Sequence, residues 1–157
     1  MGIPTFVGQS RVETFAYLRD KLSSKLTGWR STMLSAAGRE LLIKVVAQAM
    51  SLYTMNCYLL PQSLVQDLHQ LCAKFWWGST EDKRAMHWRA WDELCKPKAV
   101  GGMGFRHLYA FNLAMLAKQG WRLLQNPESL VCRLLKAIYF PHSSFWDAQL
   151  GNSPSYC

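Results

Sequence analysis

The chain has 157 residues, which fits one domain of ordinary size or one domain with a short appendage. Half of the residues are hydrophobic and 18% are charged, against about 25% in typical soluble domains, and this composition excludes low-complexity disorder. A net charge of +8 suits polyanions or anionic lipid, and charge alone does not choose between these partners.

The first predicted helix covers residues 10–29. Ser10 and Glu13 form a capping-box pattern at its start. Lys21 and Lys25 lie on the side opposite to the apolar face. That apolar face consists of residues three and four positions apart, namely Phe15, Leu18, Leu22, Leu26 and Trp29. The helix is therefore expected to be basic outside and apolar inside.

A second helix is predicted from near Ser35 to Leu59, and Pro61 ends it. Its apolar stripe is predicted to consist of Leu41, Leu42, Val45, Val46, Ala49 and Met50. Ser63 and Gln66 form another capping-box pattern, which predicts a third helix running to position 78.

The second half of the chain is more irregular. A Trp-rich stretch with one short helix covers residues 79–98, and a glycine-rich turn follows at 101–104. Helical periodicity resumes from 108 to 125, and Asn126 and Pro127 predict the start of a last helix that ends before Pro141. The tail, 142–157, is expected to be loosely attached. The sequence thus predicts a mostly α fold, with a small helical bundle in region 1–78 and a linker with two further helices in region 79–157.

Cysteine usage and the absence of targeting signals bear on the compartment. Cys57, Cys72, Cys95, Cys132 and Cys157 are too dispersed for a secreted disulfide scaffold. We found no secretory signal pattern and no uncharged apolar run of about 18 residues. We therefore expect reduced thiols, an intracellular location and no membrane partner.

The titratable residues do not form a recognisable catalytic set. The acidic doublets at 81–82 and 92–93 are typical of a solvated surface, and the four histidines are scattered. His69 and Cys72 stand at helical spacing and could share a zinc ion with Cys95 or His107, but burial explains Cys72 more simply. The glycine-rich turn lacks the Lys-Ser/Thr ending of a phosphate loop. We expect no catalytic residue, no bound metal and no cofactor.

Basic residues alternating with aromatic ones form the one pattern that suggests binding. Lys21, Lys25, Arg30, Arg39 and Lys44 could contact phosphates. Trp76, Trp77, Trp88 and Trp91 could stack on bases. The alternative is that the tryptophans belong to the core and the charges solvate a helix surface. The residues alone favour neither interpretation.

Short strings along nearly the whole chain add a resemblance. They include Gly28-Trp29-Arg30, Ala37-Gly38-Arg39, Leu42-Ile43-Lys44-Val45, Phe75-Trp76-Trp77-Gly78, Gly101-Gly102-Met103-Gly104-Phe105 and Ala117-Lys118-Gln119-Gly120-Trp121-Arg122. In these strings the chain resembles plant LINE-type, non-LTR retrotransposon reverse transcriptases. The matching stretch of that family is the thumb and the linker that leads toward a zinc-binding domain and often a ribonuclease H domain.

The resemblance implies that region 1–78 is thumb-like and that the catalytic palm precedes it. No Asp-Asp pair of the kind that binds the polymerase metals occurs in the sequence, so we expect no polymerisation by this chain alone. The implied partners are an RNA–DNA hybrid or another nucleic acid duplex, and a reverse transcriptase palm domain. By position the resemblance assigns backbone contacts to Arg30, Arg39 and Lys44. Lys21 and Lys25 join them on charge alone.

Two other interpretations remain open at this point. The first is an inert remnant or a helical protein-interaction module that associates with itself or another chain through its apolar surface. The second is a small zinc-binding helical domain.

Overall fold

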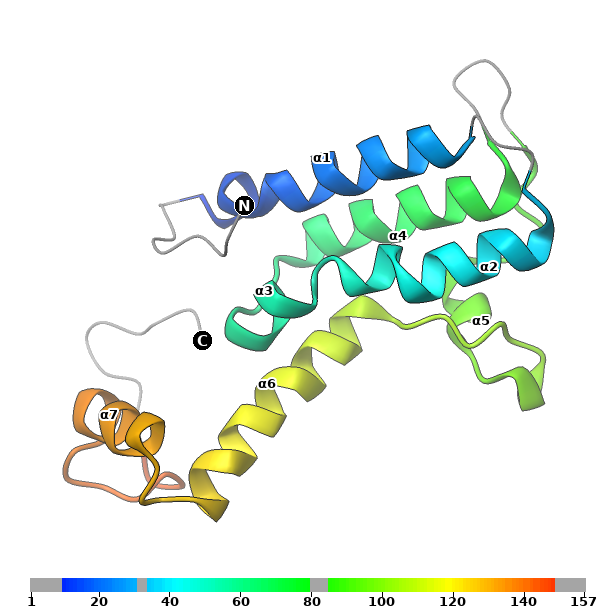
Figure 1. Ribbon diagram of the computed structural model, residues 1–157. Coiled ribbons are helices and arrows are strands. Elements are labelled where there is room, and N and C mark those ends of the chain that lie inside the picture. Colours follow the sequence, from blue (N-terminus) through cyan, green and yellow to red (C-terminus); the bar gives the residue numbers. More distant parts are fainter. Residues whose placement is uncertain (1–9, 31–33, 80–84, 149–157) are drawn as a thin grey trace.

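The computed structural model describes residues 10–30, 34–79 and 85–148, and within these ranges it contains helices and no strand (Figure 1). The mostly α prediction is therefore confirmed. The α-helices are α1 (Arg11–Arg30), α2 (Ala36–Val45), α3 (Leu52–Cys57), α4 (Gln62–Trp77), α5 (Trp91–Cys95), α6 (Leu108–Gln125) and α7 (Leu130–Tyr139). Short 3₁₀ turns occur at Ala47–Ala49 and Lys98–Val100.

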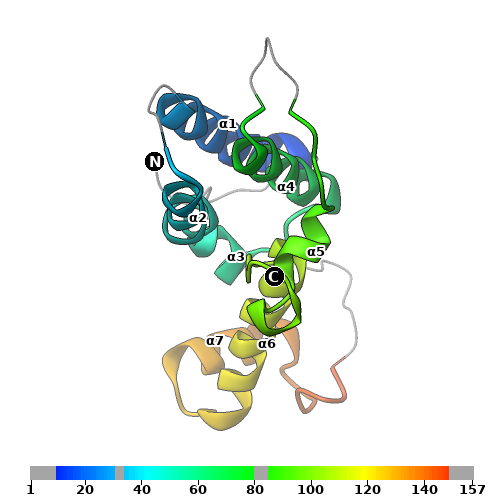
Figure 2. The same ribbon diagram turned by 90° about the vertical axis from the view of Figure 1, so that its right-hand side faces the viewer.

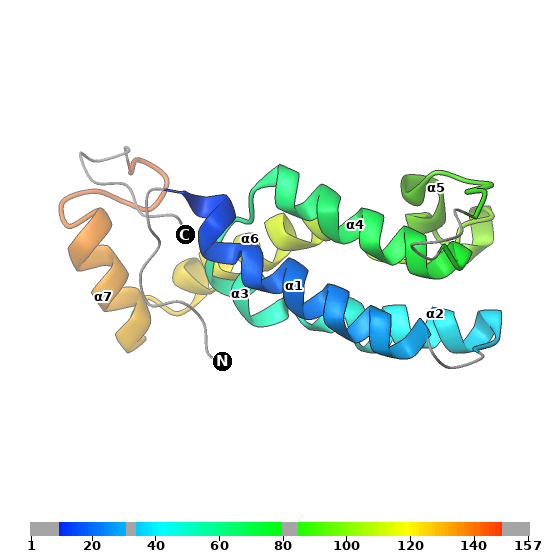
Figure 3. The same ribbon diagram turned by 90° about the horizontal axis from the view of Figure 1, so that it is seen from above.

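Helices α1, α2 and α4 form a bundle, which Figure 2 shows nearly end-on and Figure 3 shows from above. The predicted apolar face of α1 is confirmed, because Phe15, Leu18, Leu22 and Leu26 are each at most 3% exposed. Residues of α4 meet them at similar steps of three and four residues, namely Leu64, Leu68, Cys72 and Phe75. Burial of this shared apolar face holds the bundle together.

The starts of the helices agree only in part with the predicted caps. Ser10 accepts a hydrogen bond from the backbone N–H of Glu13 at 3.3 Å, as the capping-box pattern predicts. The predicted cap at Ser63 is wrong, because α4 already begins at Gln62 after Pro61 and has no side-chain cap. The last helix also starts later than predicted, since Ser129 rather than Asn126 caps it through the N–H of Cys132.

The predicted second helix is divided into α2, a 3₁₀ turn and α3. Its buried side also differs from the predicted stripe, since Ile43 is fully buried while Leu41 and Val45 are 61% and 59% exposed. Three polar side chains are buried near the break, namely Gln48, Ser51 and Thr54. Gln48 donates to the carbonyl of Arg106 at 3.3 Å, and Thr54 shares a hydrogen bond of 2.8 Å with the Tyr17 hydroxyl. An apolar stripe cannot reveal inward-facing polar groups of this kind, because their partners are distant in sequence.

The glycine-rich turn between α5 and α6 is tightly bonded. The N–H groups of Met103 and Gly104 donate to the carbonyls of Leu94 and Lys96, both at 2.9 Å. A Cβ atom on Gly102 would lie 1.9 Å from the Lys96 carbonyl oxygen, so only glycine fits there. These backbone donors are already used within the turn, which agrees with the rejection of a phosphate loop.

Helix α6 is joined to the bundle by a fully buried asparagine. The Asn112 side chain accepts from the N–H of Leu60 at 2.8 Å. It donates to the carbonyls of Met55 and Tyr58, at 2.8 and 3.0 Å. One side chain thereby satisfies three backbone groups, one near the end of α3 and two in the connection to α4. Farther along the chain, Phe145 packs against Gly120, and residues 149–157 of the predicted tail lie outside the described residues.

We expect Asn112→Ala to destabilise the fold strongly. The substitution leaves the Leu60 N–H and two carbonyls without their partner in a dry interior, at a cost of about 3 kcal/mol or more. Urea unfolding at neutral pH measures the loss. Asn126→Ala removes the same atoms from an exposed position and serves as the control. Equal stability of the two variants would contradict the structural role of Asn112.

Candidate functional site

The first part of the predicted nucleic-acid surface lies on α1. Lys21 and Lys25 stand one helical turn apart, both are exposed, and neither forms an ion pair with a residue in the described ranges. Arg19 differs from them, because Asp20 and Asp67 lie 3.4 and 4.0 Å from its guanidinium. Lys21 and Lys25 thus present charge that the described part of the protein does not neutralise.

Arg30 and Arg39 lie near the opposite end of the bundle from the start of α1. Arg30 is the last residue of α1. Arg39 is half-buried on α2, and its Nη1 atom would lie 2.9 Å from a Cβ atom on Gly78, the C-cap of α4. A guanidinium at a helix C-terminus is favourable because the dipole concentrates negative charge there. Arg39 therefore helps to pack α2 against the end of α4.

Lys44 is engaged in a small charge cluster. Its Nζ atom lies 2.7 Å from Glu40, and the Nζ atom of Lys98 lies 2.9 Å from the same carboxylate. These two hydrogen bonds hold the pKa of Glu40 below its ordinary value. Lys44 also stands 5.7 Å from the ring centroid of Phe105. Of the five predicted cations, Lys21 and Lys25 are therefore the ones shown to be exposed and unpaired among described residues.

The tryptophans divide between the two interpretations. Trp91 stacks on Phe105 with ring centroids 5.0 Å apart, and Trp76 meets the same ring edge-on at 5.5 Å. Trp77 stacks on His87 at 6.2 Å. Trp88, by contrast, is 75% exposed. Three of the four tryptophans are thus half-buried packing residues, and Trp88 is the one available to stack on a base.

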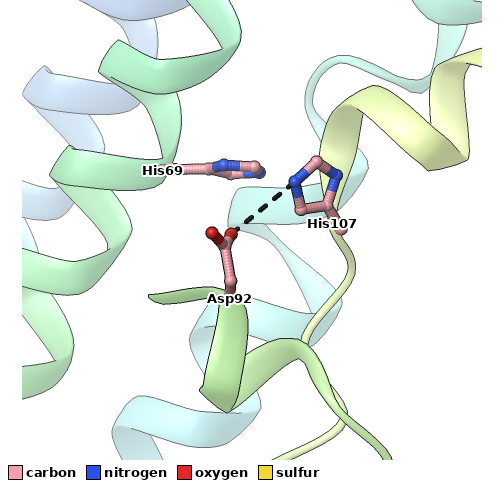
Figure 4. Close-up of side chains that lie close together, drawn as sticks. All are labelled: His69, Asp92 and His107. Carbon is pink, nitrogen blue, oxygen red and sulfur yellow. Dashed lines mark ion pairs between the residues drawn. The ribbon is translucent and has the colours of Figure 1, made fainter. Parts of the chain in front are cut away.

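A second cluster of side chains lies at the N-terminal start of α6, where α4 and α5 approach it. His69 of α4, Asp92 of α5 and His107, just before α6, bring one potential ligand atom each within 4.8 Å of the others (Figure 4). The Nε2 atom of His107 lies 3.6 Å from the Asp92 carboxylate, and the two histidine rings have centroids 5.0 Å apart. The sequence hypothesis grouped His69 and Cys72 with Cys95 or His107. The structure brings His107 close to His69, and the third member is Asp92 rather than a cysteine. No sequence signal linked Asp92, in an exposed acidic doublet, to the histidines.

Both histidines use a ring nitrogen to cap α6. The Leu108 N–H donates to Nε2 of His69 at 3.0 Å, and the Ala110 N–H donates to Nδ1 of His107 at 3.4 Å. A neutral imidazole has a single acceptor nitrogen, and in each ring this nitrogen accepts the hydrogen bond at the start of α6. The arrangement satisfies two of the N–H groups that every helix leaves unpaired at its beginning.

This capping role conflicts with metal binding. A metal ion would need one nitrogen lone pair from each ring, and a ligating histidine normally donates its other N–H to an acceptor. If a metal took the nitrogen that does not cap α6, the capping nitrogen of each ring would have to carry the proton. That ring N–H would then face the N–H group of Leu108 or Ala110. The cluster therefore fits helix capping better than metal ligation.

The nearby thiols are protonated when no metal is bound. Burial raises the pKa of Cys72 to about 12, and burial together with Asp92 raises the pKa of Cys95 to about 12. Zinc binds thiolates, so a zinc ion at these positions would have to displace both protons. Among the described residues the cluster of potential metal ligands consists of His69, Asp92 and His107 and contains neither cysteine.

Comparison with known proteins shows the family. An uncharacterized mitochondrial protein of Arabidopsis thaliana is 46% identical over 109 residues, which cover 69% of this chain and 71% of that protein. The chain belongs to the family of that protein. It is also 39% identical to a putative ribonuclease H protein of Arabidopsis thaliana over 137 residues. This second match covers 87% of the chain but 22% of the relative, so the chain spans about a fifth of that relative's length.

Other comparisons add no further assignment. No protein-family model matches the chain, and no solved structure matches it. None of the described helices combines the length and apolar character that crossing a bilayer requires.

The histidine caps predict that stability falls in mild acid. Burial, and next the neighbouring His107, lower the pKa of His69 from 6.5 to about 4. Between pH 6.5 and about 4, His69 binds a proton in the unfolded chain but not in the folded chain. The contribution of neutral His69 to the free energy of unfolding is therefore complete above pH 6.5 and is lost toward pH 4. In this range the free energy of unfolding falls by up to about 1.4 kcal/mol per pH unit.

Urea unfolding across this pH range tests the expectation with His69→Gln, whose amide oxygen can still accept from Leu108 but does not titrate. We expect a flatter pH dependence in this variant than in the native chain. His142→Gln removes an exposed histidine and should keep the native slope. A native slope in His69→Gln would show that His69 is not the titrating group.

Proposed function

We propose that this chain is the thumb-like region and following linker of a plant LINE-type reverse transcriptase, and that it binds a nucleic acid duplex without sequence preference. The strings quoted above support the family assignment. A relative named as a putative ribonuclease H protein agrees with it, because a ribonuclease H domain often follows this linker in the family that the chain resembles.

The observation that carries the binding proposal is the pair of exposed, unpaired lysines on α1. The buried face of α1 fixes the helix against α4, so Lys21 and Lys25 extend from a rigid support. Two cations one turn apart can contact neighbouring phosphates, and phosphate contacts carry no sequence information. A net charge of +8 adds attraction to the duplex over longer distances.

The proposed role is binding and positioning rather than catalysis. The polymerase metals require paired aspartates, and the sequence has no Asp-Asp pair. Catalysis would come from a palm domain, which we propose as a partner together with an RNA–DNA hybrid. Arg39 and Lys44 would act mainly through the bundle, since Arg39 packs against α4 and Lys44 pairs with Glu40.

The test is binding of the full chain to a fluorescently labelled RNA–DNA hybrid over a series of salt concentrations. Each phosphate contact contributes about 0.9 to the slope of log affinity against log salt. We expect the double variant Lys21→Ala, Lys25→Ala to bind more weakly and to lose about 1.8 from that slope. Circular dichroism of the same samples establishes that the helices are intact.

The matched control is Lys118→Ala with Lys136→Ala, which removes the same charge from exposed positions on α6 and α7. It should keep most of the native slope. Equal losses in both double variants would show that net charge alone drives binding. A folded native chain that does not bind the hybrid at low salt would overturn the proposal.

A further inference from the structure

A pocket lies where the chain turns between the end of α6 and α7 (Figure 1). Its volume is about 730 Å³, within the range of about 300–1,000 Å³ that small-molecule sites occupy. Apolar side chains from both helices and from their connection form one part of its lining, namely Leu123, Pro127, Val131 and Leu135. The pocket can therefore cover the apolar face of a ligand.

An arginine held by a chain of amide side chains lines the same pocket. The Nη1 atom of Arg122 donates to Gln119 at 3.3 Å, and the Gln119 amide donates to Asn56 of α3, also at 3.3 Å. The Asn56 amide in turn donates to the carbonyl of Leu52 at 2.9 Å. This chain uses one of the five N–H donors of the guanidinium. No carboxylate of the described residues pairs with Arg122, so its charge is open to a ligand.

The other polar residues of the pocket offer hydrogen bonds of both kinds. Gln125 and Asn126 carry amides, each of which can donate and accept. Glu128 carries a carboxylate, which accepts only, and within the described ranges it forms no ion pair. Arg122 and Glu128 thus bring opposite charges to one pocket without pairing with each other.

We propose that this pocket binds a nucleoside 5′-monophosphate, either as a free nucleotide or as the 5′ end of a nucleic acid strand. The phosphate contacts Arg122, because a planar guanidinium matches two phosphate oxygens. The face of the base lies on the apolar lining. The edge of the base carries donors and acceptors, which amides and carboxylates recognise, and it faces Gln125, Asn126 and Glu128.

Simpler ligands leave part of the pocket unmatched. An inorganic anion uses Arg122 alone, and an apolar molecule covers both charges without giving them partners, which is costly. An amino acid can pair with both charges, but it is neutral overall. The net charge of +8 therefore attracts it less than it attracts a doubly charged phosphate. A nucleotide is the class that uses the cation, the hydrogen-bonding groups and the apolar lining together.

The pocket is separate from the proposed duplex contact. Lys21 and Lys25 belong to α1 and do not line it. The double variant Lys21→Ala, Lys25→Ala should therefore bind a nucleotide as the native chain does. A failure of duplex binding leaves this inference standing, and the reverse also holds.

Equilibrium dialysis of the full chain against radiolabelled adenosine 5′-monophosphate tests the site. We expect Arg122→Gln to weaken binding about tenfold or more, because hydrogen bonds between charged partners are the stronger ones. Arg133→Gln is the matched control, since it removes the same charge from an exposed position of α7 outside the pocket lining. Circular dichroism establishes that both variants are folded. A native chain that does not bind the nucleotide, or equal losses in the two variants, would overturn the proposal.

A second pair of variants fills the pocket without changing its charge. Val131 and Leu134 are 63% and 58% exposed on α7, and Val131 lines the pocket while Leu134 does not. Val131→Trp should therefore abolish nucleotide binding, whereas Leu134→Trp should keep it. Equal binding by these two variants would place the nucleotide elsewhere on the chain.

Competition against the labelled nucleotide separates the two sources of this ligand. A single-stranded oligoadenylate with a 5′-phosphate that displaces the label at lower concentration than unlabelled adenosine 5′-monophosphate assigns the pocket to a strand end. The same strand with a 5′-hydroxyl is its control and should displace poorly. Displacement by the mononucleotide but by neither strand assigns the pocket to a free nucleotide. Inorganic phosphate or phenylalanine competing as well as the mononucleotide would overturn the proposal.

Discussion

The structure depends on the hydrogen bonds that the backbone between α3 and α4 receives where it is shielded from water. A short connection buried beneath α6 leaves polar groups that neither adjoining helix can pair. Asn112 supplies both a donor and acceptor from the facing helix, and its side chain is fully buried. The position of α6 depends on this polar junction, together with the hydrogen bonds that join Gln48 to the Arg106 carbonyl and the Leu108 N–H to His69.

The same principle operates at the start of α6, where imidazole rings take the place of the usual hydroxyl or carboxylate caps. His107 is a local cap, while His69 reaches across from α4. Histidine is an unusual choice because protonation converts its acceptor nitrogen into a donor. A cluster that resembles a metal site in composition thus acts, by its hydrogen bonds, as the attachment of one helix to another.

Local patterns predicted the parts of the fold that depend on local physics. The apolar face of α1 and the Ser10 cap are set by residues three or four positions apart, so periodicity finds them. Asn112 and His69 could not be found in this way, because their partners lie 52 and 39 positions distant in sequence. Likewise Arg39 and Lys44 look like Lys21 and Lys25 in the sequence, and the neighbours that engage them become visible only in the folded chain.

The hydrogen bond from Leu108 to His69 has a consequence for the order of folding. The first amide of α6 finds its acceptor on another helix, so α6 cannot complete its start before α4 has formed and docked. Local helix formation is then insufficient to nucleate α6 fully, and assembly of the two segments is coupled. Solvent exchange of the Leu108 amide hydrogen consequently reports the opening of the contact between α4 and α6 rather than fraying of a single helix end.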